Sequence, residues 1–175
     1  MPESSHPLVK LAEEAIISFV LYQRRIEAPR SLFDEFPGAR DAAGAFVCLK
    51  RDGVLRGCIG TTEPTSPTLA DEIIHNAIGA ATRDPRFPPL GHTELDALLV
   101  SIDVLGRSEP VENIEELDHR RYGIILRSEE RHSVLLPDIE GVNSVVEQMQ
   151  TARQKGGFAP EERVEVFRFE VTRYY

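Results

Sequence analysis

The residues best suited to chemistry lie in the segment Leu55-Arg-Gly-Cys-Ile-Gly60. Residues two apart on a strand face the same way, so the guanidinium of Arg56 can lie near the sulfur of Cys58. A neighbouring cation favours the thiolate and so activates a cysteine. Glycines in a strand let a ligand or another backbone approach closely. The segment therefore predicts a catalytic Cys58 beside ligand-binding residues, which are Arg56, Gly57 and Gly60.

A structural role for the same segment remains open. Buried cysteines are common in proteins, and Cys58 can act as a small hydrophobe. Arg56 can pair with a nearby carboxylate such as Glu63 or Asp84. The glycines can then serve a twist or a bulge of the strand.

A second candidate segment, Arg83-Asp-Pro-Arg-Phe-Pro-Pro89, carries two guanidinium groups and one carboxylate on a proline-stiffened loop. Arginine pairs readily with anions, so the functional interpretation is a ligand clamp built from Arg83, Asp84 and Arg86. The structural interpretation is that the arginines neutralise a helix terminus while Phe87 fills the core.

The remaining polar residues give weaker signals. His75 falls inside an apolar helical segment, which favours a core imidazole over a catalytic base. The sequence contains no phosphate-binding loop, dinucleotide fingerprint, serine-hydrolase motif or zinc-protease motif. Cys48 and Cys58 lack metal-ligand spacing, so we expect no metal and no cofactor.

These segments must be positioned by a small set of helices and strands. Apolar residues at three- and four-residue steps predict helices from Leu8 to Tyr22 and from Leu69 to Thr82, the second apolar nearly all round. A third helix is expected around residues 142–155, closed by Gly156-Gly157. Residues 27–43 predict an irregular surface connection. Strands are expected at 46–51, 54–59, 98–105, 122–127, 133–136 and 165–172. This order predicts an α+β fold with a largely antiparallel sheet.

The hairpin around Asp52-Gly53 allows a register to be predicted. With these two residues as the turn, Cys48 lies opposite Gly57 and Val47 lies opposite Cys58. The two cysteines would then point to opposite faces. We therefore expect no disulfide, which also agrees with a reducing compartment.

Two further structural expectations concern the later segments. The apolar phase of the last strand switches near Val166, which predicts either a bulge at Val166-Phe167 or burial of both faces. A core-directed Arg56 also needs a partner, because an unpaired buried charge is costly. We therefore expect Arg56 or Cys58 to lie beside Asp84 or Arg86.

Composition limits the classes of partner. The chain has 175 residues, 41% of them hydrophobic, which suits one domain over residues 1–175. A net charge of -9 argues against nucleic acid and anionic membranes as main partners. Met1 to His6 lack a basic region before an apolar run, and no stretch is long enough to span a bilayer. A cytoplasmic location is therefore expected.

Several segments together resemble the AMMECR domain family. The resemblance rests on Gly44 to Gly53, Leu55 to Gly60, Asn76-Ala77, Ala80 to Pro89 and Val164 to Glu170. It implies a compact two-lobed α+β protein and, in prokaryotes, the A component of an AmmeMemoRadiSam system. Its partners would be a Memo-like protein and a radical SAM protein. The family motif residues here are Arg56 to Gly60, Arg83, Asp84, Arg86 and Phe87, whereas Cys48 stands where threonine is usual.

Two functions follow from these features. The first is a binding or adaptor module whose motifs form a recognition cleft for a peptide, a small anionic ligand or a protein partner. The alternative is a small cysteine-dependent enzyme that uses Cys58 beside Arg56 on an anionic substrate. The motifs contain one plausible proton acceptor, Asp84, so the sequence favours binding and leaves enzymatic activity uncertain.

Overall fold

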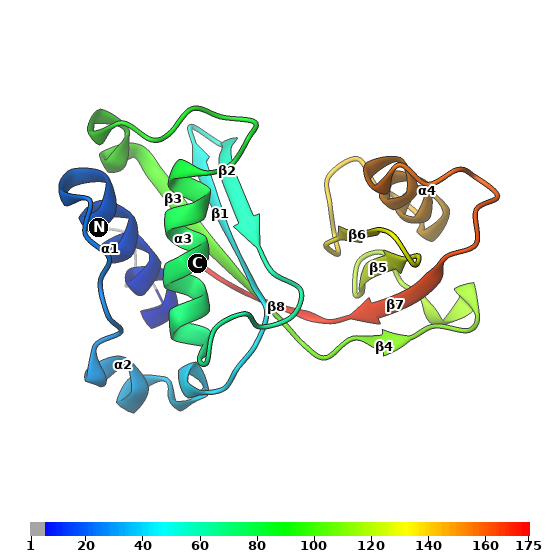
Figure 1. The fold of residues 1–175 in the computed structure, drawn as a ribbon, viewed down its shortest axis with the longest axis horizontal. Coiled ribbons are helices and arrows are strands. Elements are labelled where there is room, and N and C mark those ends of the chain that lie inside the picture. The colour runs from blue at the N-terminus through cyan, green and yellow to red at the C-terminus, as the bar shows by residue number, and fades with distance from the viewer. Residues whose placement is uncertain (1–5) are drawn as a thin grey trace. The chain divides into compact units, whose positions relative to one another are not determined.

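The computed structural model describes residues 6–175, which divide into two compact units (Figure 1). Unit 1 comprises the described residues up to Val104 together with Arg173–Tyr175. Unit 2 comprises Leu105–Thr172. The chain passes between the units after Val104 and after Thr172, and each unit has a hydrophobic cluster of its own.

Unit 1 is built from helices packed on one sheet. Its helices are α1 (Pro7–Tyr22), the short α2 (Arg30–Glu35) and α3 (Leu69–Thr82), with 3-10 turns at Pro37–Arg40 and His92–Ala97. Its sheet has the strand order β2-β1-β3-β8, formed by β1 (Ala45–Arg51), β2 (Val54–Gly60), β3 (Leu98–Leu105) and β8 (Val171–Tyr174). Strand β2 is consequently an edge strand.

Helix α3 is the central element of unit 1. It lies between α1 and the strands β1 and β2 (Figure 1). The side chain of Thr68 caps its start by accepting from the amide of Asp71 at 3.1 Å. Most of the helix is buried, as the sequence predicts. His75 is an exception because it is exposed, so its interpretation as a core imidazole is wrong.

A buried carboxylate ties the loop before α3 to the helix. Glu72 is fully buried and accepts from the amides of Thr65 and Ser66 at 2.9 and 2.7 Å. The hydroxyls of Thr61 and Thr65 donate to the same carboxylate. Burial raises the pKa of Glu72, but these four hydrogen bonds more than offset it and leave the pKa below its ordinary value.

The hairpin β1-β2 has the predicted turn but a different register. Asp52 and Gly53 have φ values of 52° and 78°, as a two-residue type I′ turn requires. The predicted pairing holds beside the turn, where Arg51 lies opposite Val54. A bulge then shifts the register between Leu49 and Lys50. Beyond the bulge Cys48 lies opposite Cys58, so the prediction that the two cysteines face opposite sides is wrong.

The strands of unit 1 are also joined by an ion pair near the chain end. Asp103 on β3 is buried and accepts from Nε and Nη2 of Arg173 on β8 at 2.6 and 2.8 Å. Hydrogen bonding to this carboxylate raises the pKa of Arg173 above its ordinary value. The pair fixes the last strand to the sheet that holds the hairpin.

Unit 2 combines a second sheet with one helix. The sheet has the order β4-β7-β5-β6, formed by β4 (Glu109–Pro110), β7 (Glu165–Phe169), β5 (Gly123–Arg127) and β6 (His132–Leu135). Helix α4 (Val145–Gly156) packs on β5 and β6 and ends at Gly157 in the left-handed conformation. A short 3-10 turn covers Ile114–Glu116.

The pairing of β7 tests the prediction of a bulge at Val166-Phe167 or burial of both faces. Strand β7 pairs regularly with β5 from Gly123 opposite Phe169 to Arg127 opposite Glu165, so the predicted bulge is wrong. Val166 and Phe167 are both half-buried, so the alternative, burial of both faces, is only partly right. The strand is interrupted at Glu170, whose carbonyl accepts from the amide of Gly106 at 2.9 Å.

The predicted α+β class with antiparallel pairing is confirmed. The irregular connection predicted for residues 27–43 is partly wrong, because it contains α2 and a 3-10 turn. Its apolar residue Leu32 is buried in the core of unit 1. Among residues 6–175, no helix combines the length and apolar character that crossing a bilayer demands.

Replacing Gly57 with alanine tests the packing of β2 on α3. A Cβ atom at this position would overlap the backbone carbonyl of Ala80, which cannot move without displacing the helix. We expect Gly57→Ala to lower the free energy of unfolding by about 1–3 kcal/mol, measured by urea denaturation. Gly91→Ala is the matched control, since its Cβ would approach only the end of the Glu94 side chain, at 3.7 Å. Equal stability of the two variants would contradict this account.

Candidate functional site

The loop after α3 covers the outer edge of β2. The amide of Cys58 donates to Oδ2 of Asp84 at 2.9 Å, and Nη2 of Arg86 reaches the carbonyl of Cys58 at 3.4 Å. Both backbone polar groups of Cys58 thus have partners on the loop instead of on another strand. An uncovered edge strand would leave such groups available for pairing with another chain. The predicted proximity of Cys58 to Asp84 and Arg86 is confirmed.

Asp84 is held by four hydrogen bonds. Besides the amide of Cys58, it accepts from the amide, Nε and Nη2 of Arg86, at 3.0, 3.0 and 2.8 Å. The carboxylate is 4% exposed. Hydrogen bonding to the Arg86 side chain is the largest cause that lowers its pKa, and the amides of Cys58 and Arg86 lower it further despite burial. Asp84 is therefore a stable anion and a poor general base.

Arg56 has a carboxylate partner that the sequence analysis missed. Its Nε and Nη2 donate to the two carboxylate oxygens of Glu94 at 2.8 and 3.1 Å, so the expected partners Glu63 and Asp84 are wrong. Glu94 also accepts from Arg51 and from the amide of Gly91. Hydrogen bonding to Arg56 is the largest cause that lowers the pKa of Glu94 to about 2.

The ring of Phe87 connects the two ion pairs. The guanidinium carbons of Arg56 and Arg86 lie 5.8 and 5.6 Å from its centroid, within range of a cation–π interaction. A continuous network therefore runs from Glu94 through Arg56, Phe87 and Arg86 to Asp84. The interpretation of Phe87 as a core plug is only partly right, because the residue is half-buried.

Cys58 forms a disulfide with Cys48, so the expectation of no disulfide is wrong. The shifted register beyond the bulge places the two residues directly opposite each other, with Cα atoms 4.2 Å apart. Both cysteines are partly exposed. A disulfide sulfur is not a thiolate nucleophile, so the catalytic role predicted for Cys58 would require prior reduction.

Gly57 and Gly60 allow close packing of other parts of unit 1 against β2. A Cβ at Gly57 would meet the carbonyl of Ala80 on α3, and a Cβ at Gly60 would meet the ring of Phe46. The expectation that another backbone approaches closely is confirmed for Gly57. The space beside Gly60 is filled by an aromatic side chain, and the ligand-binding role of both glycines stays a prediction.

The exposed part of the loop is cationic. Arg83 is exposed, and its Nη2 lies 3.4 Å from Nε2 of the exposed His75. The side chain of Arg86 is 55% exposed although it binds Asp84. Asp84 itself is buried, so two guanidinium groups reach the solvent without an equally accessible carboxylate from the same loop.

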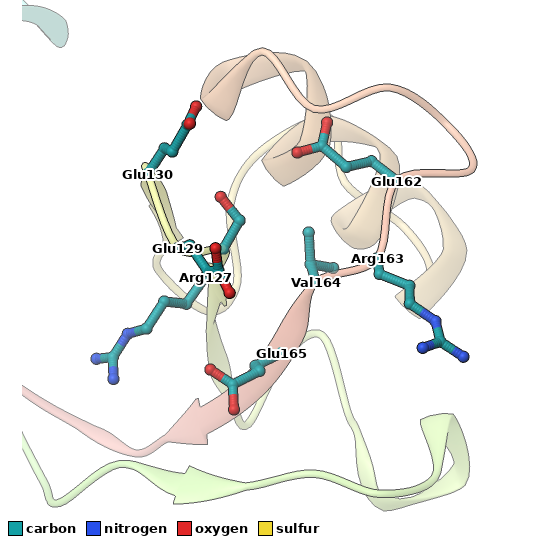
Figure 2. A pocket seen from close by; sticks show the side chains of 8 residues that line it. Arg127, Glu129, Glu130, Glu162, Arg163, Val164 and Glu165 are labelled. Atoms are coloured by element: carbon teal, nitrogen blue, oxygen red, sulfur yellow. The ribbon is translucent and has the colours of Figure 1, made fainter.

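Unit 2 contains a hollow that the sequence analysis did not find. It has a volume of about 780 Å³ and is lined by residues 127–130 and 162–165 (Figure 2). Its charged lining is mostly acidic, from Glu129, Glu130, Glu162 and Glu165. Figure 2 shows the guanidinium groups of Arg127 and Arg163 directed outward on opposite sides. All the site residues predicted from the sequence belong to unit 1 instead.

The grouping of the His, Cys, Asp and Glu side chains decides whether a metal ion could be bound. In the part of the chain that the structure describes, no three or more His, Cys, Asp and Glu residues are grouped so that they could hold a metal ion. Asp84 and Glu94 are instead bound by arginines.

Comparisons with known proteins identify the family. The AMMECR1 family model matches residues 9–174. The chain belongs to the AMMECR1 family. A Thermotoga maritima protein is 50% identical over 171 residues, covering 97% of each chain. An uncharacterised Pyrococcus horikoshii protein of known structure is 32% identical with a TM-score of 0.87, and the match covers 95% of this chain and 88% of that one.

A third relative shows this domain in a longer protein. A Clostridium acetobutylicum protein is 39% identical over 173 residues, which are 98% of this chain but 36% of that protein. The chain therefore spans about a third of the length of this relative. Most of the clostridial sequence lies outside the matched region.

The Arg56–Glu94 pair predicts a dependence of stability on acid. Because the pKa of Glu94 is lowered from 4.5 to about 2, the pair stabilises the fold above pH 4.5, and this contribution is lost as the pH falls toward 2. Glu94→Gln should cost about 1–2 kcal/mol of unfolding free energy at pH 7, allowing for solvent screening. The difference from the unaltered chain should shrink toward pH 2.5, measured by urea denaturation.

A matched control separates this effect from a general loss of charge. Glu27 is exposed and follows α1 in the same unit, so Glu27→Gln removes one carboxylate without touching the network. This variant should keep the stability of the unaltered chain at both pH values. A constant difference for Glu94→Gln from pH 7 to 2.5 would contradict the assignment.

Proposed function

We propose that this AMMECR1-family chain is a binding module that uses the loop Arg83–Phe87 to recognise an acidic segment of a partner protein. The observation that carries the proposal is the buried state of Asp84, with the arginines beside it exposed. Pro85 and the hydrogen bonds of Asp84 restrict the loop, so little conformational entropy is lost when it binds. A rigid surface with two guanidinium groups and an aromatic ring suits a carboxylate-rich partner.

The local charge of the loop differs from the charge of the whole chain. The net charge of -9 disfavours acidic partners on average. On the loop, Arg83 and Arg86 are exposed while Asp84 is 4% exposed, so its accessible charge favours an acidic segment.

The resemblance in sequence suggests which proteins to test. Prokaryotic members of the family are expected to act with a Memo-like protein and a radical SAM protein. The clostridial relative supports association with another protein region, because it carries the matching domain in a much longer chain. We propose these two proteins as partners and the cytoplasm as the place where they meet. A small anionic ligand or a peptide on the same loop is part of the same proposal.

The alternative enzyme function has less support from the geometry. The residues it would use are engaged in internal contacts: Cys58 in a disulfide, Asp84 with Arg86, and Arg56 with Glu94. Asp84, which accepts from the amide of Cys58, has a pKa well below its ordinary value. A nucleophilic mechanism would need both a reduced Cys58 and a base from outside this network.

Arg83→Glu tests the proposed binding surface. Arg83 lies outside the Asp84 network, so reversing its charge should leave the fold intact while it repels an acidic partner. We expect the affinity for the Memo-like or radical SAM protein of the same genome to fall at least about tenfold, measured by calorimetry. Binding by the unaltered chain should also weaken as the salt concentration rises.

Arg25→Glu is the matched control, since Arg25 is an exposed residue after α1 with the same charge change. It should bind as the unaltered chain does. The proposal is contradicted if neither protein binds at about 100 µM, or if the two variants bind equally.

A further inference from the structure

The Cys48–Cys58 disulfide lies in a part of the fold that does not need a covalent link. The two residues are 10 positions apart in the sequence, on strands already joined by a two-residue turn. Strand β1 is also paired with β3 on its other side. A disulfide stabilises mainly by restricting the unfolded chain, and it does so most for long loops. Opening this one should therefore leave the hairpin folded.

The pair is also placed where a reagent can reach it. Both cysteines are partly exposed, and β2 is the edge strand of its sheet. Leu49 and Gly57, the next facing pair, are buried toward α3. Side chains alternate between the faces of a sheet, so the disulfide projects from the face opposite the helix.

The backbone of Cys58 connects the disulfide to the loop. Its amide donates to Asp84 at 2.9 Å, so this amide points outward from the hairpin and Cys48–Cys58 is a pair without mutual hydrogen bonds. Such pairs usually have Cα atoms about 4.5 Å apart. Here the Cα atoms are 4.2 Å apart. A change in the spacing of these strands would therefore act directly on the contact between Cys58 and Asp84.

We propose that Cys48 and Cys58 form a reversible thiol–disulfide exchange site whose reduction loosens the contact between β2 and the loop Arg83–Phe87. Its co-reactants are dithiols in the reducing direction and disulfides of the same class in the oxidising direction. The site stands on the contacts of unit 1 alone and does not depend on the partner binding proposed above.

The exchange is balanced in electrons and protons. A thiolate of the external dithiol attacks one sulfur, and the electron pair of the broken S–S bond stays on the other sulfur, which takes a proton from water. The second thiol of the reagent then attacks the mixed disulfide. Cys48 and Cys58 end as thiols, and the reagent, having lost two electrons and two protons, ends as an intramolecular disulfide.

The first test counts thiols on the full chain. The protein is equilibrated in mixtures of reduced and oxidised dithiothreitol, alkylated, and weighed by mass spectrometry, while circular dichroism reports the fold. We expect no free thiols at the oxidising end and two at the reducing end, released together with an unchanged spectrum. The proposal is overturned if both thiols are free under every mixture, or if they appear only when the chain unfolds.

The second test follows the backbone of Cys58. Hydrogen exchange of its amide should become about tenfold faster on reduction, because the bond to Asp84 is weakened. Cys48→Ser should show this faster exchange without a reductant and no further change with one, which makes it the matched control for effects of dithiothreitol. An exchange rate that is the same in both redox states would overturn the coupling to the loop.

Discussion

The carboxylate of Asp84 replaces a missing neighbour strand at the edge of the first sheet. It accepts the amide of Cys58, and the arginine it holds reaches the carbonyl of the same residue. One side-chain pair thus satisfies both backbone groups at the centre of an edge strand. Buried polar groups without partners are costly, so this contact stabilises both the sheet edge and the loop that supplies it. The position of the partly exposed Arg86 side chain follows from the same arrangement.

Close packing of α3 on β2 explains why the loop arrives at this point. Gly57 has no side chain, so the carbonyl of Ala80 in the last turn of α3 can lie directly on the strand. Asp84 follows four residues later, after the helix has ended at Thr82. It therefore reaches the edge beside Cys58, the residue after Gly57. Two segments more than twenty residues apart in sequence meet because the last turn of α3, with Gly79, Ala80 and Ala81, packs closely on the strand.

Local patterns predicted most elements of unit 1 correctly. The period of apolar residues gave α1 and α3, and Asp52-Gly53 gave the turn of the hairpin. The segments Leu55–Gly60 and Arg83–Phe87 meet as predicted, but through the amide of Cys58 and Asp84, whereas the charge of Arg56, on which the prediction rested, is paired with Glu94. The helices and the turn depend on residues close together in sequence, which a single sequence carries.

The errors came from contacts that no local pattern records. A bulge adds one residue to β2 near Arg56, and this single shift turned Cys58 toward Cys48 and overturned the predicted absence of a disulfide. Glu94 lies in a 3-10 turn far along the chain from Arg56. No local pattern distinguishes it from the other acidic residues as the partner of Arg56. His75 interrupts an apolar helix at the one angle that faces solvent, which the average hydrophobicity of the segment concealed.

The distribution of contacts changes how the two motifs are understood. Arginine, cysteine and aspartate in short segments resemble catalytic groups, yet here each has an internal partner that uses its reactive atom or charge. What remains available to another molecule is the outer part of the loop, and its position is fixed by Asp84. Cys58 connects this loop to the disulfide, because its backbone amide donates to Asp84 and its side chain is bonded to Cys48. The proposed opening of the disulfide would therefore act on the hydrogen bond between Cys58 and Asp84, the carboxylate that holds Arg86.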